Sequence, residues 1–181
     1  MRWRDINREI VARLSGNAAL ADERPIIVIE SDRQLLHWLD IEDDKSRSYP
    51  ISTAANGMGN RVDSYKTPSG IHRVRQKIGG GQPRGTVFEA RKPTGRVTRN
   101  LDNRDQDEIT SRILWLDGLE QGFNRDGDCD TYSRYIYIHG TSDEKRIGEP
   151  VSAGCIRMKN QDVEVAYDML TEGKSTVKVV D

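Results

Sequence analysis

The sequence predicts a mainly β protein with one folded domain. Short runs rich in β-branched and aromatic residues recur along the chain, and turn signals such as Asn56-Gly57 and Gly79-Gly80-Gly81 separate them. A length of 181 residues suits a single domain. The net charge is −1 and the mean hydropathy is −0.74, which indicate a globular chain with a polar surface and a thin core.

The first element expected is an amphipathic helix within residues 1–20 that packs on the domain or leads into it. Apolar residues recur there at helical spacing, and Gly16 can end the helix. Residues 21–181 would form the domain itself. Seven runs in it predict strands, at 26–30, 49–54, 71–77, 86–90, 113–116, 135–138 and 176–180.

One further helix is expected between the last two strands. Val163, Ala166 and Leu170 form an apolar stripe at helical spacing. Asn160 is the N-cap candidate, and Gly173 follows the end of the helix.

Charge is divided unevenly along the chain. Residues 61–100 carry ten Lys or Arg and two acids, whereas residues 101–130 carry three and nine. The basic stretch lacks the helix or aromatic platform of a nucleic-acid module, so we expect no nucleic-acid partner. A solvated loop face, or a site for carboxylate-bearing substrates, fits it better.

Neither a membrane span nor an export signal is visible. No apolar run approaches the roughly 20 residues of a membrane helix, and the early run at 26–29 is too short for a signal-peptide core. Either the protein is cytoplasmic or its export segment lies outside this sequence. The two cysteines allow at most one disulfide.

The densest group of reactive residues lies near the C-terminus. His139 follows the predicted strand 135–138, so we expect it at the end of that strand and at an edge. Cys155 lies in a Gly-flanked turn before the second helix, where exposed amides and a helix terminus would favour a thiolate. A Cys with a His in reach is the minimum for acyl transfer. The alternatives are a small buried Cys and a structural His.

Other candidates give weaker signals. Asn124, Asp126, Asp128 and Asp130 alternate like an EF-hand loop, but the sixth-position Gly and the final Glu are missing, so an acidic loop is expected. We therefore expect no metal and no cofactor. The sequence also predicts a flexible hairpin or lid at the triple glycine. His37 and His72 are expected at the surface, Cys129 as an unpaired thiol, and Trp115 in the core.

Four ordered motifs resemble those of one family. The stretch His139-Gly140-Thr141, then nine residues, then 151–158 (VSAGCIRM) resembles the signature of the YkuD-type L,D-transpeptidases. The segments 49–53 (YPIST) and 67–70 (TPSG) are similar to a strand and a turn of that family. The resemblance covers about 26–180 and implies a β-sandwich of mixed sheets, with a helix after the Cys loop, for the catalytic domain 21–181.

The resemblance also implies residue roles. Cys155 would be the nucleophile, His139 its general base, and the Gly140 carbonyl the group that orients the imidazole. Amides of Gly154 and Cys155 would form the oxyanion hole. Ser152 would support that hole. The residues implied to contact substrate are Arg157, Thr141 and Tyr137.

The implied reaction is acyl transfer on peptidoglycan tetrapeptide stems by a monomeric protein of the periplasm or cell envelope, with cytoplasmic location as the alternative. An amine acceptor gives a 3→3 cross-link, and water would make the enzyme an L,D-carboxypeptidase. One departure from the family pattern is Ala153, where the motif has a histidine. A peptidoglycan-binding module with lapsed catalysis therefore remains a third possibility.

Overall fold

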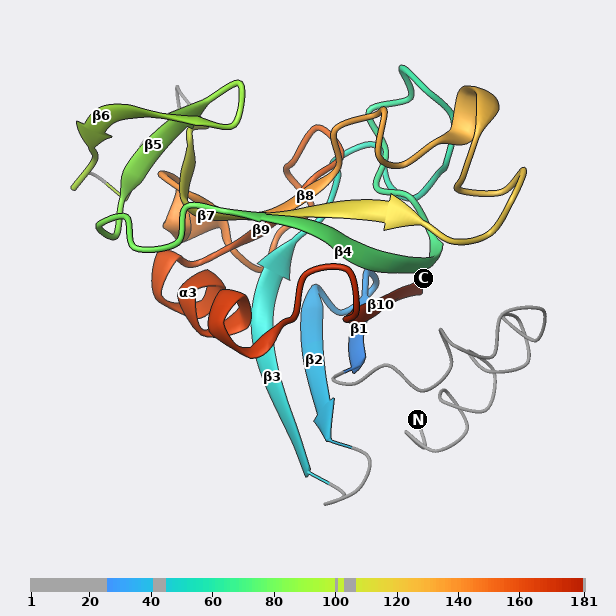
Figure 1. Ribbon diagram of the computed structural model, residues 1–181, viewed down its shortest axis with the longest axis horizontal. Helices are drawn as coiled ribbons and strands as arrows, with labels where there is room; N and C mark the ends of the chain where they lie inside the picture. The colour runs from blue at the N-terminus through green and yellow to red at the C-terminus, as the bar shows by residue number, and fades with distance from the viewer. Residues whose placement is uncertain (1–25, 41–44, 100, 103–106, 181) are drawn as a thin grey trace.

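The computed structural model describes residues 26–40, 45–99, 101–102 and 107–180. Within these residues, ten strands form one mixed sheet in the order β4-β10-β1-β2-β3-β9-β8-β7-β5-β6 (Figure 1). The strands are β1 (Ile26–Glu30), β2 (Leu35–Asp40), β3 (Lys45–Ser52), β4 (Gly70–Ile78), β5 (Thr86–Glu89), β6 (Lys92–Val97), β7 (Ile109–Gly118), β8 (Tyr137–Thr141), β9 (Ile156–Met158) and β10 (Thr176–Val180).

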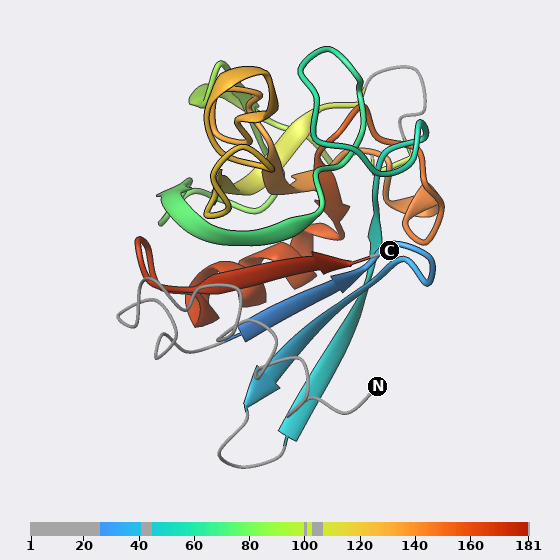
Figure 2. The same cartoon turned by 90° about the vertical axis from the view of Figure 1, so that its right-hand side faces the viewer.

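The sheet folds back and closes on itself, because β4 pairs with β7 as well as with β10. Two strand pairs, β1 with β10 and β8 with β9, are parallel, and the other pairs are antiparallel. Seen from the side, β4 and β7 lie in one layer and β10, β1, β2 and β3 lie in the other (Figure 2). The mixed β architecture was predicted, and the two layers are joined by continuous strand pairing.

The predicted helix after the Cys loop is present as α3 (Asn160–Met169), which packs against β7 and β8. Val163, Ala166 and Leu170 are buried among apolar residues of the sheet, as the helical stripe predicted. Burying a Val or Leu side chain contributes about 1.5–3 kcal/mol, so this stripe holds the helix against β7 and β8, and β8 carries His139.

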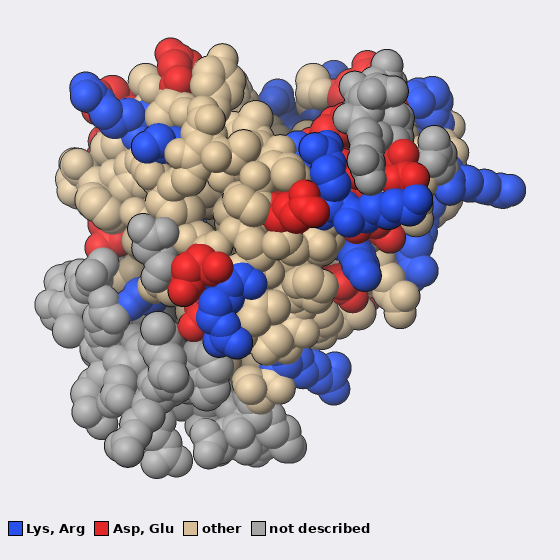
Figure 3. Space-filling view, turned by 180° about the vertical axis from the view of Figure 1, so that it is seen from behind, with Lys and Arg blue, Asp and Glu red and all other residues tan. Residues whose placement is uncertain are grey.

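The closed sheet also explains the uneven charge. Because β4 and β7 are neighbours, basic residues of 61–100 meet acidic residues of 101–130. Arg73 and Arg75 both contact the buried Asp117, at 3.0 and 3.8 Å, and Arg96 contacts Glu108 at 2.6 Å. Basic and acidic side chains are correspondingly interspersed on the surface seen from behind (Figure 3). Much of the basic stretch is therefore neutralised by its own neighbours.

Several expectations about the elements need correction. The predicted turn at Pro93 and Gly95 lies within β6, an exposed edge strand that needs no partner for the missing proline N–H. The strands β2 and β9 were not predicted. β9 has only three residues and is defined by its pairing with β3 and β8, which no local pattern indicates. The helix predicted within 1–20 lies outside the described residues.

Two histidines expected at the surface are buried. His72 is 0% exposed, and its ring contacts Gly70 O and Thr131 Oγ1, each at 3.2 Å. Burial lowers the His72 pKa to about 4. His37 lies between Ser48 and Glu30, at 2.7 and 3.1 Å. No helix among the described residues is long and apolar enough to cross a bilayer.

Candidate active site

The parallel pairing of β8 with β9 brings His139 and Cys155 together. The register aligns Ile138 with Ile156 and His139 with Arg157, and Cys155 directly precedes β9. Side chains alternate along both strands, so the two isoleucines enter the core while His139, Arg157 and Cys155 share the opposite face. The site therefore lies on neighbouring strands inside the sheet.

The strand position of His139 differs from the prediction. β8 begins two residues later than expected, so His139 lies within the strand and is only 2% exposed. Its Nδ1 lies 2.7 Å from Gly140 O. A carbonyl oxygen can only accept, so Nδ1 carries the proton and Nε2 presents a lone pair. Burial lowers the pKa of His139, and the imidazole is accordingly neutral near pH 7.

Cys155 is a neutral thiol at rest, which corrects the expectation of a thiolate. Its Sγ donates to Tyr135 O at 3.5 Å and accepts from Tyr137 N at 3.4 Å, so its bonds go to main chain rather than to the imidazole. Burial raises the Cys155 pKa to about 11, outweighing the opposing effects of the Tyr137 N–H and of Arg157 and Arg134. β9 separates Cys155 from the start of α3.

Ser152 shapes the turn that precedes the nucleophile. Its Oγ donates to Cys155 O at 2.5 Å and accepts from Gly154 N at 3.1 Å. The Gly154 amide is thus already hydrogen-bonded in this state. Gly154 has a φ of +131°, which explains the need for glycine. Its carbonyl accepts from Thr67 Oγ1 at 2.9 Å.

The two upstream motifs lie around this turn. Ser152 forms a bridge with Ala54, directly after segment 49–53. Thr67, from segment 67–70, also accepts from Ala54 N at 2.9 Å. Segments far apart in sequence thus converge on the loop that holds Cys155.

Three residues expected to contact substrate are buried. Arg157 is 5% exposed and pairs with Asp107 Oδ2 at 2.6 Å, while its Nε and Nη1 have no partner among the described residues. Thr141 is buried and donates to Asp107 Oδ1 at 2.8 Å. Tyr137 is buried, and its ring is perpendicular to that of Trp115 with the centroids 5.4 Å apart. In this arrangement Arg157 and Thr141 support the site from within.

Asp107 is a site residue that sequence reasoning missed. Asp107 pairs with Arg157, and its negative charge also acts on the catalytic candidates. The charge opposes the effect of burial on the His139 pKa and adds to the effect of burial on the Cys155 pKa. The only available signal was its place in the acidic stretch, which carries nine acids.

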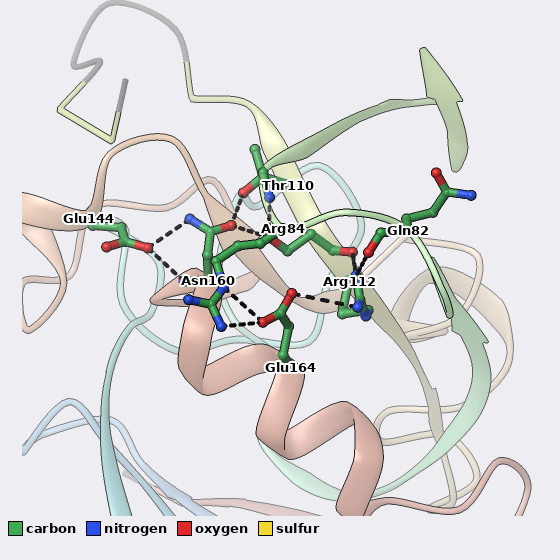
Figure 4. A network of polar contacts seen from close by, with 9 residues as sticks. Gln82, Arg84, Thr110, Arg112, Glu144, Asn160 and Glu164 are labelled. Carbon is green, nitrogen blue, oxygen red and sulfur yellow. Dashed lines mark hydrogen bonds and ion pairs between the residues drawn. The ribbon is translucent and has the colours of Figure 1, made fainter. Parts of the chain in front are cut away.

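Asn160 was predicted as a helix N-cap and has a larger role. Lys159 is the N-cap, and the buried Asn160 side chain links α3 to two strands (Figure 4). Its Oδ1 accepts from Thr110 Oγ1 at 2.6 Å and Ser111 Oγ at 2.5 Å, and its Nδ2 donates to Thr141 O at 2.8 Å. The chain beside Gly140 is thereby fixed.

A small cavity lies beside the departure from the family motif. Ala153 is exposed and lines a cavity of about 260 Å³ together with Tyr65, Arg134 and Tyr135. Arg134 lines the cavity and also holds the loop 59–66 in place, because its guanidinium donates to carbonyls of that loop, including Asn60 O at 2.8 Å and Lys66 O at 2.7 Å. The missing motif side chain would point into open space rather than into packed protein.

Other candidates for chemistry are used structurally. No group of three or more His, Cys, Asp or Glu able to hold a metal occurs in the described ranges. In the loop that resembles an EF-hand, Asn124 Nδ2 donates to Ile71 O at 3.1 Å, and Asp130 accepts from Ser133 N at 2.7 Å. Cys129 is a free thiol and Trp115 is buried, as predicted.

Several solved structures with similar folds are described as L,D-transpeptidases. L,D-transpeptidase 3 from Mycobacterium tuberculosis, in complex with a faropenem-derived adduct, is 18% identical with a TM-score of 0.55, covering 88% of this chain and 61% of that one. An L,D-transpeptidase from Mycobacterium smegmatis is 17% identical with a TM-score of 0.51, covering 88% and 59%. This chain thus spans about three fifths of those two chains.

A comparison with curated protein sequences gave no match. The family model of the L,D-transpeptidase catalytic domain, YkuD, matches residues 24–179. That span includes every strand except the last residue of β10, together with α3 and both residues of the Cys and His pair. The chain therefore belongs to the YkuD family of L,D-transpeptidase catalytic domains.

Proposed function

We propose that this protein is a peptidoglycan L,D-transpeptidase that uses Cys155 as its nucleophile. The observation that carries the proposal is the geometry of His139: its Nδ1 donates to Gly140 O at 2.7 Å, which leaves the lone pair on Nε2, and the side chain shares a face of the sheet with Cys155. The substrate would be a tetrapeptide stem, cleaved between its diamino acid and the terminal D-alanine.

The reaction follows from the protonation states at rest. As Sγ attacks the scissile carbonyl, His139 Nε2 takes the thiol proton, so the thiolate forms only during attack. The Cys155 amide and neighbouring amides would stabilise the oxyanion, while Ser152 holds the turn. His139 then gives its proton to the leaving D-alanine amine, and a thioester remains on Cys155.

The acceptor determines the product. Attack by the side-chain amine of a second stem yields a 3→3 cross-link and regenerates the thiol. Attack by water yields a tripeptide, which is the L,D-carboxypeptidase reaction.

Incubation with disaccharide tetrapeptides, followed by mass spectrometry, tests these alternatives. Cross-linked dimers indicate transpeptidation, and tripeptides alone indicate hydrolysis. Unchanged substrate, together with no carbapenem adduct on Cys155, would indicate a binding module without catalysis. Fractionation of the native protein tests the proposed envelope location against a cytoplasmic one.

Two cysteine variants form the matched control. Cys155→Ala should abolish acyl-enzyme formation, whereas Cys129→Ala should leave it nearly intact, because only Cys155 lies in the motif beside His139, and the Cys129 thiol bonds to Asp126 O in a separate loop. His139→Ala should slow acylation by about 10²–10⁴-fold, the usual contribution of a positioned base. Equal losses in both cysteine variants would contradict the assignment of the nucleophile.

A further inference from the structure

The proposed substrate carries carboxylates that need a cation near Cys155. A stem ending in D-alanine has a free α-carboxylate next to the scissile bond, and its diamino acid can carry a second carboxylate. Arg157 does not fill this role, because it is buried and paired with Asp107. An exposed basic side chain beside Cys155 would be better placed to meet such a carboxylate.

Arg91 is placed there by the β5–β6 hairpin. Glu89 pairs with Lys92, so Ala90 and Arg91 form a two-residue turn. Both have positive φ values, 46° and 67°, as the turn that matches the twist of a tight hairpin requires. The hairpin extends from the sheet edge (Figure 1). Every residue of β6 is exposed.

The Arg91 side chain lies on aromatic residues that border the thiol. Its Cζ is 5.1 Å from the Trp115 ring centroid and 5.0 Å from that of Tyr135. Hydrogen bonding with the side chain of Tyr137 raises the Arg91 pKa. Cys155 packs against the cluster that contains Trp115 and Tyr137. Arg91 and the nucleophile thus flank the same aromatic surface.

The charge of Arg91 is not neutralised within the described part of the chain. Other arginines of the basic stretch have carboxylate partners: Arg84 pairs with Glu164 at 2.6 Å and Arg96 with Glu108 at 2.6 Å. No such ion pair involves Arg91 among the described residues. Its contacts are aromatic faces, which orient a guanidinium and leave its charge available to a ligand.

We propose that Arg91 binds a substrate carboxylate beside Cys155 and so selects stems with a free acid at that position. This inference rests on the proposed function. Arg91 acts in binding rather than in bond cleavage, so its loss should raise KM and leave kcat nearly unchanged.

The test compares tetrapeptide stems that differ only in charge. One peptide has a free C-terminal D-alanine, a second ends in D-alaninamide, and a third has the diamino-acid carboxylate amidated. Binding is measured by calorimetry to Cys155→Ala protein, with and without Arg91→Gln, and turnover is measured with Cys155 present. Lys92→Gln, the adjacent exposed residue of the same hairpin, is the matched control.

Protein with Arg91 should bind the free acid about 10- to 100-fold more tightly than one of the two amides, the range expected for a charged hydrogen bond. Arg91→Gln should remove that preference, Arg91→Lys should retain part of it, and Lys92→Gln should retain all of it. The carboxylate whose amidation weakens binding is the one that Arg91 contacts.

The assignment of Arg91 would be overturned if Arg91→Gln protein still preferred the free acid over the amides to the full extent, or if protein with Arg91 showed no such preference. In either case, release of D-alanine would still support the proposed function. Failure to bind any of the three peptides would overturn both proposals. Binding that depends on Arg91 without any D-alanine release would count against the proposed function alone.

Discussion

The reactivity of Cys155 should increase with pH well beyond neutrality. The perturbation is a pH series from 6 to 10.5 in Cys129→Ala protein, which leaves a single thiol. Burial raises the Cys155 pKa to about 11. The thiolate is the reactive form, so alkylation should accelerate across the series without a plateau.

The magnitude follows from the difference between the folded and unfolded thiol. At pH 8 an exposed thiol with the ordinary pKa of 9.0 is about one tenth ionised, and one with a pKa of about 11 is about one thousandth ionised. Iodoacetamide labelling, followed by mass spectrometry, should therefore be about 100-fold slower in folded protein than in the same variant unfolded in urea. Reduced access to the thiol can only add to this difference.

The same shift predicts a loss of stability at high pH. A thiol pKa that is raised by folding stabilises the protein below the unfolded value, and this contribution is lost as pH rises from about 9 to 11. Two units correspond to about 3 kcal/mol. The difference in unfolding free energy between Cys129→Ala protein and the variant that also carries Cys155→Ala isolates this effect.

A labelling rate that is level between pH 6 and 8, or that exceeds the unfolded rate at pH 7, would refute this reasoning. Either result would mean that the resting site holds a thiolate and an imidazolium. The proton transfer proposed to accompany attack would then already have occurred before substrate binds.

Three further predictions concern Asn160, His72 and Ala153. Asn160→Ala removes four side-chain hydrogen bonds and should lower the unfolding free energy by about 4 kcal/mol, measured by urea titration, whereas the exposed control Gln161→Ala should change it by less than about 0.5 kcal/mol. His72 has its pKa lowered to about 4, so its contribution to stability, about 3 kcal/mol, should be lost as pH falls from 6.5 through 4, and His72→Gln should lack this dependence; equal pH profiles would contradict it. Ala153→His should keep the melting temperature, because the new ring enters an open cavity, and should accelerate carbapenem acylation about tenfold; an unchanged rate at an unchanged melting temperature would show that this position is neutral.

Local patterns in the sequence were sufficient for most elements and for the family. The runs of β-branched residues at 26–30 and 176–180 predict buried strands, and the helical stripe through Val163 and Leu170 predicts a helix with one buried face; the structure has both strands and the helix. The motif around Cys155 carries its own turn geometry, because Ser152 bonds within the same few residues. Such contacts are short in sequence, so the residues themselves encode them.

Tertiary structure alone decided the environments of the charged and titratable groups. The sequence suggested a substrate contact at Arg157 and a thiolate at Cys155, whereas strand pairing buries Arg157, partly buries Cys155, raises the pKa of its thiol and supplies Asp107 from a distant segment. His139 moved from a strand end to the sheet interior because β7 and β9 pair on either side of β8. Burial and charge pairing depend on which segments become neighbours when the sheet closes, and no local pattern states that. The motifs were enough to identify the family and to nominate Cys155 and His139, whereas the environment of their side chains depended on how the sheet closes.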